Sequence, residues 1–199
     1  MSTPDYKKIT QSLNYVARKE GGHINYMKAL KLLYLADRLH LRKYGRLISD
    51  DTLVAMKNGT LGSQARDIVL KNDSLPHVVY EYAEGRLKRD LGKYSIGVKD
   101  KSTDSLSETD VECLDTVYGV LGDKGEFDLA KLTHELPEWK RFQYPIEKQE
   151  VQVAKLLISD LFETTENKEL NKIYSQSKDE IELSRSIFKE SVEQEKYLV

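Results

Sequence analysis

The first third of the chain carries two segments whose apolar residues recur at helical spacing. Four of them lie near the start of the chain: Tyr6, Ile9, Leu13 and Val16. This spacing predicts a helix that ends before Gly21. A second helix is expected from about Asn25 to Lys43, ended by Gly45. Its leucines point to nearly every side, which is typical of a helix buried at the centre of a domain.

The middle of the chain changes character after Gly45. Leu53–Met56 is too short for a helix and predicts an extended segment, closed by a turn at Asn58-Gly59. Ser63 is a candidate N-cap for a helix through about Leu70. Two further segments, Val78–Ala83 and Tyr94–Val98, are rich in β-branched and aromatic residues. They predict two antiparallel strands, with Gly85 and Gly92 marking turns.

The C-terminal half is predicted to be helical. Ser107 with Asp110 has the spacing of a capping box and begins a helix that reaches about Leu121. Asp128 is expected to cap a short helix that Pro137 ends. Three more helical segments are expected: Glu147–Phe162, Asn167–Tyr174 and Lys178–Val192. The predicted fold is therefore mainly α (α+β): a compact helical domain around a central buried helix, with a small antiparallel β element and a helical C-terminal extension.

Composition narrows the class of protein. With 31 basic and 33 acidic residues, the net charge is −2, so the basic excess of a phosphate-binding protein is missing. The helices at 110–121 and 128–135 have helix-turn-helix proportions, but Lys131 is the only basic residue of the second, which argues against DNA. One cysteine, Cys113, excludes an intrachain disulfide. No apolar run resembles a signal peptide or a membrane span, so we expect a cytoplasmic protein that does not contact membranes.

Few residues point to catalysis. The four histidines have no metal-ligand spacing, and no nucleotide-binding or hydrolase motif occurs, so we expect no metal, no cofactor and no enzyme. Asp37 lies on an apolar stripe of the central helix and needs a partner there. It is either a structural acid, paired with a neighbouring arginine or a backbone amide of the 45–51 loop, or a functional acid. Trp139, the only tryptophan, either fills the core or contacts a partner.

Two blocks of sequence resemble the Panacea domain, the SocA-like antitoxin domain that is also known as phage-associated. The first block comprises Lys31–Arg38, Leu41, Tyr44-Gly45-Arg46, Ile48, Asp51, Val54-Ala55-Met56 and Gly59; the second comprises Leu132-Thr133-His134 and Trp139-Lys140. Gly59-Thr60 stands where the family typically has Gly-Pro. The resemblance covers about Tyr6 to Ile146. It implies a Panacea domain over 1–146, on which a helical extension, 147–199, would pack.

The resemblance also implies a function. Proteins of this family neutralise a cognate toxin, in several cases one that blocks translation, by direct binding. Alternatives are an adaptor that delivers a partner to a protease, a DNA-binding regulator of its own operon, and an enzyme centred on Asp37. A protease or a chaperone is therefore a second candidate partner beside the toxin. The candidate partner-binding residues are Leu157, Leu161, Phe162, Ile181, Ile187, Phe188 and Trp139. Packing onto the core is the alternative role for all of them. Neither the identity of the toxin nor the oligomeric state follows from the sequence.

Overall fold

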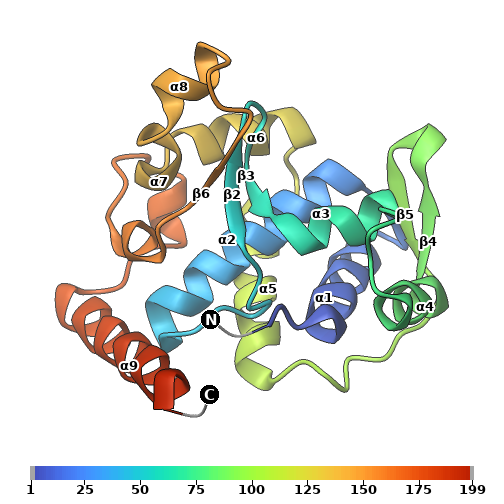
Figure 1. Ribbon diagram of the computed structural model, residues 1–199, viewed down its shortest axis with the longest axis horizontal. Coiled ribbons are helices and arrows are strands. Elements are labelled where there is room, and N and C mark those ends of the chain that lie inside the picture. Colours follow the sequence, from blue (N-terminus) through green and yellow to red (C-terminus); the bar gives the residue numbers. More distant parts are fainter. Residues whose placement is uncertain (1–2, 198–199) are drawn as a thin grey trace.

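The central helix predicted from the sequence is present. The computed structural model describes residues 3–197, and helix α2 (Tyr26–Tyr44) passes through the middle of them (Figure 1). Every residue from Lys28 to Arg42 is buried. The Asn25 side chain caps the start of α2 by accepting a hydrogen bond from the Met27 amide at 2.8 Å. Gly45, with φ 70°, ends it in the left-handed conformation that favours glycine.

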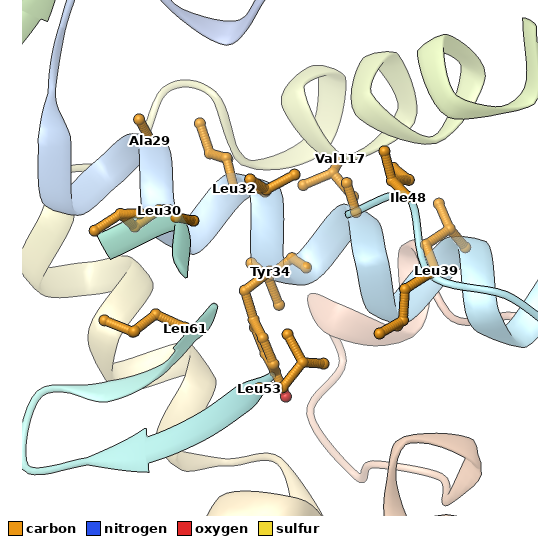
Figure 2. Packing of buried hydrophobic residues seen from close by; sticks show 14 of the residues in the cluster. Ala29, Leu30, Leu32, Tyr34, Leu39, Ile48, Leu53, Leu61 and Val117 are labelled. Carbon is orange, nitrogen blue, oxygen red and sulfur yellow. The ribbon is translucent and has the colours of Figure 1, made fainter. Parts of the chain in front are cut away.

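Other helices surround α2. They are α1 (Tyr6–Lys19), α5 (Glu108–Leu121), α6 (Glu126–His134) and α9 (Lys178–Tyr197). Figure 2 shows α2 side chains facing two ways: Leu32 lies beside Val117 of α5, and Tyr34 extends towards Leu53. The predicted capping box at the start of α5 is confirmed, because each of the two side chains, Ser107 and Asp110, accepts a hydrogen bond from the backbone amide of the other residue. Burial on all sides by these neighbours explains why α2 is apolar almost all round.

Two small antiparallel sheets complete the fold. One has the order β3 (Gly59–Gly62), β2 (Leu53–Met56), β6 (Val153–Lys155), and Ala55 of β2 pairs with both Thr60 and Ala154. The other has the order β1 (His23–Asn25), β5 (Ser95–Val98), β4 (Leu87–Asp90). The expected class, mainly α with a small antiparallel β element, is confirmed.

The prediction of a strand at 78–83 is wrong. This segment belongs to helix α4 (His77–Arg86), and the strand that pairs with β5 is β4, which follows it directly. Val79 and Ala83 are buried four residues apart, whereas Val78 is 57% exposed. Two buried residues four positions apart lie on one face of a helix. The prediction rested on the β-branched and aromatic composition of the run, which does not show this spacing. Gly85 therefore lies inside a helix rather than in a turn.

The long helix predicted at 147–162 is also wrong. The chain forms the short helices α7 (Pro137–Lys140) and α8 (Gln143–Glu147), then β6, then the 3₁₀ helix η2 (Ile158–Phe162). Only a 3₁₀ turn, η3 (Leu170–Lys172), forms within 167–174. The last predicted helix, α9, is confirmed. Strand β6 occupies the edge of β2, so pairing with a strand far away in sequence decided the conformation of 153–155.

Two predicted helix caps are replaced by others. Gly62 occupies the N-cap position of helix α3 (Ser63–Leu70), and the carboxylate of Asp51 accepts hydrogen bonds from the Gln64 and Ala65 amides at 2.9 and 2.8 Å. Ser63 is therefore not the cap. Gly125, rather than Asp128, precedes α6.

Because residues 147–199 supply an edge strand to the β3–β2–β6 sheet and a helix that packs on α2, the division at 146 stays a prediction. Within residues 3–197 no helix combines the length and apolarity that crossing a membrane would require.

Candidate functional site

Asp37 ties α2 to the loop that follows it. One carboxylate oxygen accepts the Ser49 amide at 2.9 Å, and the other accepts the Ser49 hydroxyl at 2.6 Å. Ser49 Oγ in turn accepts the amide of Asp51, the residue that caps α3. Burial raises the pKa of Asp37 to about 7, although the Ser49 hydrogen bonds partly oppose this. The Asp37 carboxylate therefore has the partners in the 45–51 loop that a structural acid needs, and among residues 3–197 it forms no ion pair with an arginine.

We expect Asp37→Ala to lower the free energy of unfolding by roughly 2–6 kcal/mol, because it leaves two buried donors of Ser49 without an acceptor, at a cost of about 1–3 kcal/mol each. Asp37→Asn retains an acceptor and provides the control. Because the folded pKa of Asp37 lies above the ordinary value, the folded state binds the extra proton, so wild-type stability falls as the pH rises from about 4 to about 7. Urea denaturation across this range is the measurement. A slope as steep in Asp37→Asn as in wild type would contradict the assignment.

A buried ionic network begins at Arg38, the residue of α2 that follows Asp37. Arg38 Nε donates to Glu138 Oε1 at 2.8 Å, and neither side chain is exposed. The Tyr34 hydroxyl donates to the same oxygen. Within the described chain, Arg38 Nη1 and Glu138 Oε2 are buried without a hydrogen-bond partner. The network therefore joins the first sequence block, at 31–38, directly to the second, at 132–140.

The same face of α2 holds the C-terminal segment. Arg38 Nη2 and Arg42 Nη1 donate to the Glu163 carbonyl at 2.7 and 3.0 Å. The Tyr174 hydroxyl donates to the Leu35 carbonyl at 3.0 Å, and its ring lies 4.4 Å from the Arg38 guanidinium carbon. Cation–π contacts of this kind strengthen where water is excluded. Residues 163–174 are thus bound to the central helix by polar contacts as well as by packing.

Lys31 is a buried amine of α2. Its Nζ donates to the Thr60 carbonyl of β3 at 2.7 Å, and it has no carboxylate partner among residues 3–197. Burial lowers the pKa of Lys31 to about 7. Gly59 leaves room for this side chain: a Cβ there would lie 2.9 Å from Lys31 Nζ and 2.1 Å from Thr133 Oγ1. Because Gly59 has no side chain, β3 can pack closely against both α2 and α6.

The structure separates the predicted partner-binding residues into two groups. Four are buried in the core and present almost no surface to a partner: Leu161, Phe162, Trp139 and Ile181. Trp139 stacks on His134 and donates its indole N–H to the Met56 carbonyl at 3.0 Å, so its ring is occupied by contacts within the fold. Leu157 and Ile187 are 49% and 43% exposed, and Phe188 is partly buried against Phe162. Of the seven predicted residues, only these three are not buried within the described structure.

Sequence reasoning missed Lys31, Arg38, Arg42 and Glu138 as a buried polar set. A signal existed, because Arg38 and Arg42 are four residues apart on a helix that is apolar on nearly all sides, and such charges must find partners. Their partners, Glu138 and main-chain carbonyls beyond residue 160, could not be identified from spacing. Among residues 3–197 no group of three or more histidine, cysteine or acidic side chains could hold a metal ion.

The comparisons with known proteins identify the family. The model of the family described as "Antitoxin SocA-like, Panacea domain" matches residues 30–140, more than half of the chain. No curated protein and no solved structure shows a significant match. The matched region begins in α2 and ends with α7, so it includes Asp37, the Arg38–Glu138 pair and Trp139. The chain belongs to the SocA-like antitoxin family, and its Panacea domain is built around helix α2.

Proposed function

We propose that this protein is an antitoxin that neutralises a cognate toxin by direct protein–protein binding, without a catalytic step of its own. The observation that carries the proposal is the family match over residues 30–140. The buried polar groups described above support it, because Asp37, Lys31 and Glu138 are all inaccessible and bonded within the fold. Groups of this kind hold a rigid scaffold on which exposed residues can bind a partner.

The exposed apolar residues of the C-terminal segment are the first candidate surface. Leu183 and Ile187 of α9 are 63% and 43% exposed and lie four residues apart, hence on one side of the helix. Leu157, between β6 and η2, is 49% exposed. Apolar side chains that cluster on a surface mark protein interaction sites more often than scattered ones do. The partner-binding role of Leu157, Ile187 and Phe188 is therefore kept in this proposal, and Leu183 is added.

The function is tested by growth rescue. The product of the adjacent gene is induced alone and together with this protein, and the pair is then purified through a tag on one partner. We expect restored growth and a stable complex. A harmless neighbour that does not co-purify would contradict the antitoxin function. Restored growth with a shortened half-life of the partner and no stable complex would indicate a proteolytic adaptor instead.

Point variants locate the surface better than truncation does. Deletion of residues 167–199 would remove the buried Leu170 and Tyr174, the latter bonded to the Leu35 carbonyl of α2, so it would damage the fold as well as any interface. We expect Leu183→Ser with Ile187→Ser to weaken toxin binding by roughly tenfold or more, the usual effect of removing a central apolar contact. Val78→Ser, on the exposed side of α4, is the matched control. Equal toxin affinity for both variants would place the interface elsewhere.

A further inference from the structure

A cavity of about 460 Å³ opens between the start of α2, the β2–β3 hairpin and the chain that leads into β6. Figure 1 shows this chain, after α8, passing beside the tip of the hairpin, in agreement with the pairing of Met56 and Val153. The cavity floor is apolar and is formed by Met27, Leu30, Met56, Leu61, Ile146 and Val151. Its volume lies within the range of about 300–1,000 Å³ that is typical of ligand sites.

The polar residues around this cavity all carry hydrogen-bond donors. Lys57 and Arg66 are the charged ones, and the amides of Asn58, Gln149 and Gln152 accompany them. Among the described residues that line the cavity, none is acidic. Lys57 is exposed and has no ion pair within residues 3–197, while Arg66 has only a 3.8 Å contact with Asp67. An apolar floor under two cations is complementary to an apolar group that carries a carboxylate.

A smaller cavity of about 260 Å³ adjoins the first and shares Lys57, Ile146 and Gln149 with it. His134 and Trp139 line it, and His134 Nε2 is buried without a hydrogen-bond partner in the described chain. Glu147 lines only this smaller cavity, so an anionic group is favoured at the Arg66 side of the larger one. The two cavities together extend the apolar floor towards the Trp139 ring.

We infer that the larger cavity receives a segment of the partner protein in which an apolar side chain lies next to a carboxylate. The apolar side chain fills the space over Met27 and Met56, and the carboxylate lies at the Arg66 side, where the positive charges of Arg66 and Lys57 attract it. Beyond the cavity lie the exposed Val153 of β6 and, after the end of that strand, the exposed Leu157, and an extended partner segment would pass over them. This inference rests on the proposed function, because it assigns the cavity to the toxin.

The first test does not need the toxin. Two of the three methionines of the chain, Met27 and Met56, line the cavity, so methionine-methyl NMR reports on it directly. We expect N-acetyl-phenylalanine to shift both methyl signals and to bind several-fold more tightly than its uncharged amide. In Lys57→Ala/Arg66→Ala this preference should disappear. Absence of any shift up to the solubility limit of the probe would overturn the inference, as would equal affinity for acid and amide.

The second test uses the complex. Lys57→Glu/Arg66→Glu should weaken binding of the adjacent-gene toxin by roughly tenfold or more, because like charges across an interface repel. Lys88→Glu, on the exposed side of β4, should leave it unchanged. If wild type binds the toxin and the cavity variant binds it equally well, the inference fails while the antitoxin function stands. If wild type binds no toxin, the proposed function fails, and the NMR titration still decides whether the cavity takes a carboxylate ligand.

Discussion

Glu138→Ala is expected to lower the free energy of unfolding by roughly 3–5 kcal/mol, the usual cost of removing one partner of a buried ion pair. The Arg38 guanidinium would stay buried without its carboxylate, and the Tyr34 hydroxyl would lose its acceptor. Glu135→Ala is the matched control. Its carboxylate pairs with Lys140 at 3.3 Å on the surface and is about half exposed, so its removal should cost less than about 1 kcal/mol.

The measurement is urea denaturation of both variants and of Arg38→Met/Glu138→Leu. Replacing both charges by apolar groups removes the desolvation penalty of the pair, so the double variant should be clearly more stable than Glu138→Ala. Recovery should stay incomplete, because Arg38 also donates to the Glu163 carbonyl. If Glu138→Ala is no less stable than Glu135→Ala, the pair does not bear on the stability of the fold.

Gly45→Ala is expected to disrupt the packing of α9 on the end of α2. A Cβ at 45 would lie 2.6 Å from the Ser184 carbonyl oxygen, which belongs to the backbone and cannot rotate away. The residue also has φ 70°, which costs roughly 1–2 kcal/mol for an alanine. Adding about 1–3 kcal/mol for overpacking gives an expected loss of about 2–5 kcal/mol.

Gly119→Ala is the matched control, because it lies in the interior of α5 with no atom within 4 Å of the new methyl. It should stabilise the protein by roughly 0.5–1 kcal/mol. Thermal denaturation gives the sign for both variants, and amide hydrogen exchange shows where protection is lost. In Gly45→Ala the loss should concentrate in α9 around Ser184. Unchanged protection there would contradict the close packing of α9 on the end of α2.

The Arg38 network and Gly45 bear on the proposed function because both join the C-terminal segment to the family core. Arg38 and Arg42 bind the carbonyl at Glu163, and Gly45 allows α9 to approach. The exposed Leu183 and Ile187 are thereby held on a fixed support. A variant that loosens α9 while leaving α2 intact should lose toxin binding if this helix carries the interface, and should retain it if the cavity beside Met56 carries the interface alone.

The sequence alone determined those parts of the protein whose signals are local. Helices α1 and α2 were predicted from the spacing of their apolar residues, and the end of α2 from Gly45. The start of α5 was predicted from the capping-box spacing of Ser107 and Asp110, and α9 was among the predicted C-terminal helices. Asp37 was singled out because a carboxylate on an apolar stripe must be bonded. The resemblance to the Panacea domain came from short blocks of sequence, and the family match confirms it.

Only the tertiary structure decided the remaining features, because they depend on groups far apart in the chain. Residues 78–83 and 153–155 are short segments whose sequences suit a helix or a strand equally. Packing against α1 determined the helix at 78–83, and pairing with β2 determined the strand at 153–155. The same holds for the cap of α3 by Asp51, for the Arg38–Glu138 pair across 100 residues, and for the burial of Leu161 and Phe162. Apolar spacing shows that a face is covered, whereas the fold alone decides whether the core or a partner covers it.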